Sequence, residues 1–81
     1  MIKINTPDGW MVEEAGWSLE VYRPYAQGRY EMVGTVQPEG EGWFRASVES
    51  RIPGITSSKA ISLRSAQAAV DWIVRRAGSV A

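Results

Sequence analysis

The sequence predicts an α+β fold in which an antiparallel β-sheet of three to five strands packs on one C-terminal α-helix. Between residues 17 and 50, apolar and polar side chains alternate with the period of two that is typical of half-buried strands. Between residues 66 and 77, apolar residues instead recur at intervals of three and four, as on a helix that lies on a sheet. A run of strands followed by one helix, with short connections, gives a two-layer α+β arrangement.

The length and composition indicate one globular domain that spans residues 1–81. A chain of 81 residues is too short for two separate cores, and 44% hydrophobic with 22% charged residues is typical of a folded globular chain. No segment is apolar over the length that a signal peptide or a membrane span requires. We therefore expect a cytoplasmic protein with no membrane partner.

The first fifteen residues predict a short N-terminal hairpin. Ile2 and Ile4 alternate with polar neighbours, and residues 6–9 (Thr-Pro-Asp-Gly) have the composition of a tight turn. The second arm then begins at Trp10. A terminal segment that is loosely attached to the domain would give the same pattern, so this alternative stays open.

Residues 17–50 predict a three-stranded antiparallel sheet. Turns at 24–28 and 38–42 separate the strands, since proline ends ladder donation and glycine accepts the backbone conformations that reversals need. The side chains expected to face the core are Trp17, Leu19 and Val21 in the first strand and Phe44, Ala46 and Val48 in the third. In the second strand, Tyr30, Met32, Gly34 and Val36 are expected to share one face. The outer face is expected to carry Glu20, Tyr22, Arg29, Glu31, Val33, Trp43 and Arg45.

Residues 65–77 predict the helix. Ser65 can cap it, because the serine hydroxyl can accept an amide hydrogen bond from the first turn. The apolar stripe consists of Ala66, Ala69, Val70, Ile73, Val74 and Ala77. Gly78 is expected to close the helix in a left-handed conformation. Before the helix, residues 51–58 are expected to form a loop and residues 59–63 a short edge strand.

The composition excludes most catalytic and metal-binding sites. The chain has no cysteine and no histidine, which removes thiolate ligands, imidazole ligands and the usual bases of hydrolases. Glu13 and Glu14 are the one adjacent carboxylate pair, but neighbours on a strand point to opposite faces. Nine basic residues balance nine acidic ones, so no net charge attracts nucleic acid or anionic lipid. We expect no enzymatic activity, no metal and no cofactor.

Two groups of aromatic and arginine side chains are candidates for partner binding. The first is Trp72 with Arg75 and Arg76, because these helix positions lie away from the apolar stripe and Trp72 should be exposed. Trp and Arg are enriched among the side chains that dominate binding energies. The N-terminal hairpin could instead fold over this side of the helix and bury Trp72.

The second group lies on the outer face of the sheet and comprises Tyr22, Arg29, Glu31, Trp43 and Arg45. Its mixture of both charges with two aromatic rings suits a protein partner better than a phosphate backbone. An ordinary solvated sheet face with cross-strand pairs would have a similar composition, so both interpretations are kept.

Residues 28–74 resemble the arm-type DNA-binding domain of tyrosine integrases, a three-stranded sheet on one C-terminal helix. The segment Gly42-Trp43-Phe44-Arg45 and the helix from Ser65 to Trp72 carry this likeness. The resemblance implies a small DNA-binding domain whose sheet enters the major groove through a basic face. In this sequence, three glutamates share that face with Arg29 and Arg45.

The small size, the absence of cysteine and of catalytic residues, and the strand-then-helix pattern also resemble small phage-encoded anti-CRISPR proteins. This resemblance implies a phage or mobile-element inhibitor that acts in the bacterial cytoplasm by occluding a host protein, for example a CRISPR effector subunit. Such an inhibitor is the leading hypothesis, and DNA binding through the sheet is the alternative. A third hypothesis is a homodimer formed through exposed Trp72.

Overall fold

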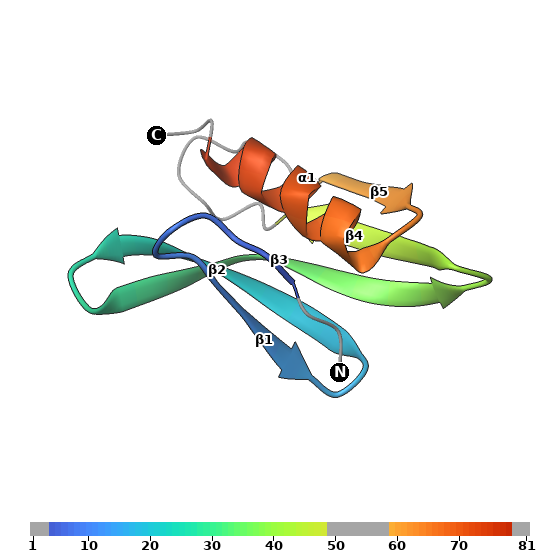
Figure 1. The fold of residues 1–81 in the computed structure, drawn as a ribbon, viewed down its shortest axis with the longest axis horizontal. Coiled ribbons are helices and arrows are strands. Elements are labelled where there is room, and N and C mark those ends of the chain that lie inside the picture. Colours follow the sequence, from blue (N-terminus) through green and yellow to red (C-terminus); the bar gives the residue numbers. More distant parts are fainter. Residues whose placement is uncertain (1–3, 49–58, 79–81) are drawn as a thin grey trace.

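The computed structural model describes residues 4–48 and 59–78, which form a five-stranded antiparallel sheet and one α-helix (Figure 1). In chain order the elements are β1 (Met11–Ala15), β2 (Ser18–Ala26), β3 (Arg29–Gly40), β4 (Trp43–Val48), β5 (Lys59–Leu63) and α1 (Ala66–Gly78). The strand order in the sheet is β1-β2-β3-β4-β5, so each strand pairs with its neighbours in sequence. The α+β fold class is confirmed.

The sheet is covered by α1 on one side, where the helix packs mainly on β3 and β4. This side is called the inner face and the opposite side the outer face. The expected short edge strand is present as β5. The loop expected at residues 51–58 and the end of the third expected strand, residues 49 and 50, lie outside the described residues.

The core lies between α1 and the central strands. Its buried side chains come from β2, β3 and β4 on one side and from the apolar stripe of α1 on the other: Val21, Val33, Val36, Ala46, Val48, Ala69, Val70, Ile73 and Ala77. Small alanines are interspersed with larger residues in this set, which lets the helix approach the sheet closely. The helical stripe predicted from the sequence is therefore the buried face of α1.

Gly34 is the point of closest approach between helix and sheet. A Cβ atom at this position would lie 2.5 Å from the Ser47 carbonyl oxygen and 2.8 Å from Cγ2 of Ile73. A space this narrow does not admit a Cβ atom, because the Ile73 side chain packs directly on the backbone of β3. This contact explains why a glycine stands in the middle of a long central strand, where it would otherwise weaken the strand.

A β-bulge in β3 overturns the faces expected for the second strand. Val21 pairs with Gly34, but its neighbour Tyr22 pairs with Met32, which leaves Val33 as an extra residue on β3. Val33 is completely buried instead of lying on the outer face. The bulge shifts the alternation by one residue, so the predicted common face of Tyr30, Met32, Gly34 and Val36 is wrong.

The expected position of Glu31 on the outer face is wrong for the same reason. Its carboxylate lies 2.8 Å from the Arg23 guanidinium on the inner side of the sheet. The same guanidinium donates to the Ala77 carbonyl of α1 at 3.2 Å. Arg23 and Glu31 therefore attach the last turn of the helix to β2 and β3.

Trp17 does not face the core, contrary to expectation. It lies in the turn between β1 and β2, and its side chain is 90% exposed. Gly16 before it has a φ of 63°, which fits the first central position of a type II′ hairpin turn. The alternation of Trp17 with Leu19 and Val21 predicted a strand that includes Trp17, but β2 begins one residue later, at Ser18.

The N-terminal segment lies against one flank of α1. The Asn5 amide donates to Gln67 Oε1 at 2.8 Å, and Gln67 Nε2 donates to the Asn5 carbonyl at 2.9 Å. A turn closes with the Trp10 amide on the Pro7 carbonyl at 3.1 Å, after which β1 pairs with β2. Residues 1–3 of the expected N-terminal hairpin lie outside the described residues, and residues 4–10 form no strand.

The helix begins as expected and ends differently. The Ala68 amide donates to Ser65 Oγ at 3.0 Å, which confirms the predicted cap. Gly78 is the last residue of α1 and does not adopt the left-handed conformation that was expected of it.

Within residues 4–48 and 59–78, no helix combines the length and the apolar character needed to cross a bilayer.

Candidate functional site

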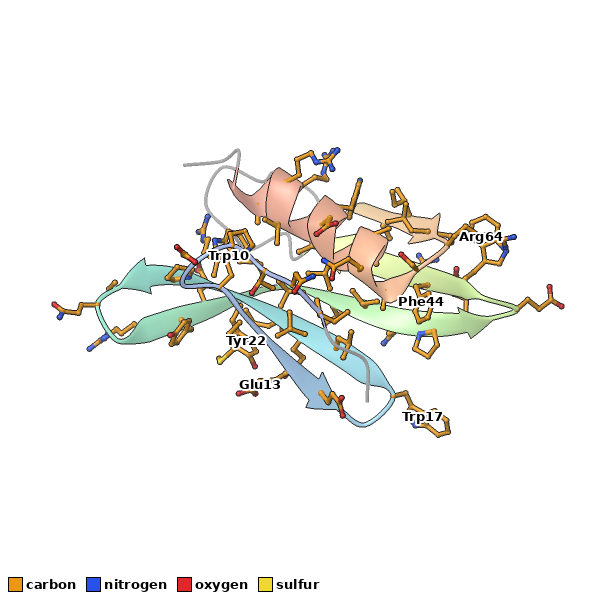
Figure 2. The ribbon with its side chains drawn as sticks, in the orientation of Figure 1. Trp10, Glu13, Trp17, Tyr22, Phe44 and Arg64 are labelled. Carbon is orange, nitrogen blue, oxygen red and sulfur yellow. The ribbon has the colours of Figure 1, made fainter. Side chains whose placement is uncertain are left out.

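Two hairpin turns and the start of the helix lie at the same end of the molecule. These are the β1–β2 turn with Trp17, the β3–β4 turn at residues 40–42, and the junction between β5 and α1 (Figures 1 and 2). Figure 2 shows Trp17, Phe44 and Arg64 at this end. We call it the hairpin end. It carries two of the large hydrophobic side chains that are exposed among the described residues, Trp17 and Trp43.

An apolar cleft of about 270 Å³ opens at the hairpin end, on the inner face of the sheet. It exists because α1 starts at Ala66 and leaves the ends of β2, β3 and β4 uncovered beyond that point. The lining residues are Glu14, Gly16, Trp17, Ser18, Leu19, Val36, Pro38, Phe44 and Ala66. Most of this lining is hydrocarbon, so the cleft is suited to an apolar group.

The position of Trp17 at the mouth of this cleft follows from local backbone chemistry. The central residues of a two-residue hairpin turn belong to no strand face, so the side chain of Trp17 is left in solvent. The residue thus borders the cleft through the hairpin turn, and its indole projects away from the chain without being packed (Figure 2). Exposure of a large aromatic ring beside an apolar cleft is typical of a binding surface.

A polar cluster also lies at the hairpin end, on the outer side of β4 and β5, and none of its residues lines the cleft. The Arg64 guanidinium lies over the Trp43 ring, 4.4 Å from its centroid. Glu39 accepts a hydrogen bond from Ser62 Oγ at 2.5 Å and lies 3.7 Å from the Arg45 guanidinium. These contacts hold Trp43 and both arginines in place at the edge of the hairpin end.

Glu41 forms the tip of the β3–β4 turn in a backbone conformation that glycine normally provides. Its φ is 55°, and it is the one residue other than glycine with positive φ among the described residues. Gly40 and Gly42 on either side have φ values of 96° and 82°. A side chain in this region costs about 1 to 2 kcal/mol relative to glycine. The carboxylate is therefore presented to solvent at a cost in stability.

The two sequence-predicted groups are not brought together by the fold. Trp43 and Arg45 lie at the hairpin end, whereas Arg29 follows the β2–β3 turn at the opposite end of these strands. Tyr22 lies on the outer face, whereas Glu31 pairs with Arg23 on the inner face. The expected single patch of aromatic and arginine residues on the outer face is therefore split.

Trp72 is half-buried, whereas full exposure was expected. Its ring packs against the core, and Arg76 lies over it with its guanidinium carbon 5.4 Å from the ring centroid. Helical side chains lean toward the preceding turn, which in α1 contains the small residues Ala68 and Ala69 and leaves room for the indole. Arg75 is exposed. The described N-terminal segment lies on the Gln67 flank, so it is not the element that partly buries Trp72.

The outer face carries more negative than positive charge. Glu13 and Glu20 are direct cross-strand partners there, and the Tyr22 hydroxyl donates to Glu20 at 2.9 Å (Figure 2). That hydrogen bond raises the pKa of Tyr22 above its ordinary value, and desolvation and the charges of Glu20 and Glu13 act in the same direction. Within the described residues, no group of three potential ligands is arranged to hold a metal ion.

Several residues of the hairpin end were not predicted from the sequence to belong to a binding site. Trp17 was assigned to the core, and Arg64 was assigned no role. Phe44 does pack against the core as expected, but its place in the cleft lining was not predicted. A signal for Trp17 was present, because Gly16-Trp17 stands between two alternating segments as a glycine-first hairpin turn would. No comparable signal identifies Arg64, since its contact with Trp43 depends on how β5 pairs with β4.

No protein-family model, curated protein or solved structure matches this chain. The function is therefore inferred from the fold and from the chemistry of the hairpin end.

Proposed function

We propose that this chain is a non-enzymatic binding protein that attaches to a partner protein through its hairpin end. Trp17 enters a recess of the partner, and the adjacent apolar cleft receives a side chain from the partner. The observation that carries this proposal is a 90% exposed tryptophan held on a tight hairpin turn at the mouth of an apolar cleft.

The energy available from Trp17 is sufficient to anchor a complex. A buried tryptophan removes roughly 150 to 250 Å² from water, which at roughly 25 cal/mol per Å² corresponds to about 4 to 6 kcal/mol before the costs of association. The hairpin fixes the backbone at Trp17, so the order still required on binding is that of the exposed ring. Aromatic anchors dominate many protein interfaces.

The size of the cleft favours a side chain over a cofactor. Sites for drug-sized ligands and cofactors usually enclose about 300 to 1,000 Å³, and this cleft of about 270 Å³ lies just below that range. Its lining provides few polar groups to orient a small molecule, with Glu14 and Ser18 as the exceptions. One or two apolar side chains of a protein partner match it better.

The charges at the surface support a protein partner over DNA. On the outer face, the carboxylates of Glu13 and Glu20 have no basic partner among the described residues, and Arg45 is paired with Glu39. A phosphate backbone would be repelled by such a face. DNA binding through the sheet, as the integrase resemblance implies, is therefore the second candidate.

The more specific proposal is that the chain is a phage or mobile-element inhibitor that occludes a host protein surface in the bacterial cytoplasm. It rests on the resemblance to anti-CRISPR proteins, and the hairpin end supplies a binding surface of the kind such an inhibitor needs. A homodimer through Trp72 is less favoured, because much of that ring is already used in packing against the core of its own chain.

Site-specific photocrosslinking tests the proposed surface. A photoreactive phenylalanine replaces Trp17 in one version of the protein and Arg29, at the opposite end of β3, in a matched control. Expressed in bacteria, the position 17 probe should give a defined protein adduct and the position 29 probe should not. Adducts at position 29 alone would refute the hairpin end as the binding surface.

Two further assays separate the partner classes. In bacteria with active CRISPR immunity, expression of the protein should restore phage plaques, and Trp17→Ala should abolish this effect. Unchanged immunity in every system tested would remove the specific inhibitor proposal. A gel-shift assay on duplex DNA at low salt should show no complex, and a complex that weakens steeply with salt would favour the DNA-binding alternative.

A further inference from the structure

The outer edge of β1 offers a second binding surface, separate from the apolar cleft. β1 is a terminal strand of the sheet and pairs only with β2 among the described residues. Glu13, Glu14 and Ala15 are exposed. An unpaired strand edge presents a row of free amide and carbonyl groups that another extended chain can complete.

The hairpin geometry indicates which groups point away from β2. Ala15 and Ser18 flank the two-residue turn and pair with each other. In an antiparallel ladder, residues that exchange both hydrogen bonds alternate with residues that exchange none. Because Ala15 and Ser18 exchange backbone hydrogen bonds, Glu13 and Met11 also form backbone hydrogen bonds with β2. The backbone amide and carbonyl groups of Val12 and Glu14 therefore point away from β2. These two residues supply the free donors and acceptors.

The two carboxylates of β1 lie next to a third carboxylate, that of Glu20 on β2. Glu13 lies directly opposite Glu20 on the outer face, and like charges in this position destabilise a strand pair. Glu14 adds a carboxylate on the inner face. Among the described residues, neither Glu13 nor Glu14 forms an ion pair with a basic side chain.

The same carboxylates oppose pairing between two copies of this chain. In the antiparallel register that overlaps all five residues of β1, Glu13 would face Glu13 of the second copy. That contact repeats the unfavourable charge pair already present within the sheet. A partner strand with basic side chains would instead neutralise Glu13 and Glu20 together, because both lie on one face.

We propose that the β1 edge binds an extended basic segment of a partner protein as a sixth strand of the sheet. Backbone hydrogen bonds to Val12 and Glu14 provide the pairing, and alternate lysine or arginine side chains contact Glu13 and Glu20 on the outer face. This surface goes beyond the function proposed above, since it does not use Trp17 and shares only Glu14 with the lining of the apolar cleft.

A synthetic peptide tests this proposal with the wild-type protein. The probe is a fluorescent, acetylated peptide of about seven residues with alternating lysine and valine, a length that matches a typical strand, and binding is followed by fluorescence anisotropy at low salt. Two control peptides have glutamate in place of lysine or N-methyl groups on alternate amides. The lysine peptide should bind, and both control peptides should bind at least about tenfold more weakly, because one loses the charge match and the other the strand pairing.

Variants of the protein locate the surface. The double variant Glu13→Gln with Glu20→Gln should weaken binding about fivefold to tenfold, as expected for the loss of the two outer-face charge contacts. Glu14→Pro removes the outward amide of residue 14 and should reduce binding further, with circular dichroism to verify that it is folded. Trp17→Ala should bind the lysine peptide as the wild type does.

Three results of the peptide experiment would overturn the proposal. Absence of binding at millimolar peptide refutes it, and so does an N-methylated peptide that binds as well as the parent, since charge alone would then be responsible. If Trp17→Ala abolishes peptide binding, the peptide occupies the hairpin end and not the β1 edge. If Trp17→Ala fails to compete for the crosslinked partner but still binds the peptide, the two surfaces are independent.

Discussion

Replacement of Gly34 by alanine should destabilise the protein strongly, although it adds only one methyl group. The new Cβ would lie 2.5 Å from the Ser47 carbonyl oxygen, which belongs to the β3–β4 ladder, and 2.8 Å from a methyl carbon of Ile73. Ile73 can change its side-chain conformation, but the carbonyl oxygen cannot move without separating two central strands. Overpacking of a core usually costs about 1 to 3 kcal/mol, and a backbone contact places this variant at the upper end, about 3 kcal/mol.

The measurement is urea unfolding followed by tryptophan fluorescence. With a slope of about 1 kcal/mol per M for a protein of this size, a loss of about 3 kcal/mol lowers the midpoint by about 3 M, or leaves the chain unfolded without urea. Gly78→Ala is the matched control, because its Cβ meets nothing closer than 3.9 Å and the residue is helical. The control should be neutral or slightly stabilising. A midpoint for Gly34→Ala within about 0.5 M of the wild type, a margin of about 0.5 kcal/mol, would refute the close helix–sheet contact.

Three further outcomes test the hairpin end and the outer face. Glu41→Gly should stabilise the fold by about 1 kcal/mol in the same urea assay, because glycine adopts a φ of 55° without strain, and a loss of stability would contradict this. Trp17→Ala should change stability by less than about 0.5 kcal/mol, since the residue is 90% exposed. As an unlabelled competitor, wild-type protein should displace the photocrosslinked complex, whereas Trp17→Ala should not. Glu20→Gln should lower the pKa of Tyr22 in an ultraviolet titration, because it removes the carboxylate that raises this pKa. The raised pKa stabilises the folded state below about pH 10, and this contribution disappears as pH rises through the folded-state pKa of Tyr22. An unchanged titration curve would show that the hydrogen bond to Glu20 is not made in solution.

The hairpin end and the β1 edge provide complementary kinds of binding energy. The hairpin end offers apolar area around Trp17 and Phe44, which is insensitive to salt. The β1 edge offers backbone hydrogen bonds and carboxylates, and the effect of the carboxylates weakens as salt increases. Glu14 belongs to both, since it lines the cleft and lies on β1. Salt dependence measured on a natural partner would therefore indicate which surface it uses.

The helix and the order of the elements were accessible from the sequence. Ala66, Val70, Ile73 and Ala77 recur at helical spacing, and Ser65 stands where a capping hydroxyl is needed, so local patterns within about a dozen residues were sufficient. The same holds for the strands, whose turns contain glycine or proline. Short-range periodicity reports which face of an element is apolar, and that is enough to assign an α+β fold.

The binding surfaces depended on long-range pairing that periodicity does not contain. One extra residue at Val33 exchanged the two faces of β3, moved Glu31 to the helix side and broke up the expected outer patch. Trp17 is exposed because it belongs to the turn and not to β2. The cleft beside it exists because α1 begins at Ala66 and leaves the ends of β2, β3 and β4 uncovered. A bulge, a turn boundary and the start of a packed helix each result from competition between distant contacts. A single sequence read locally gives the same alternation for either outcome of that competition.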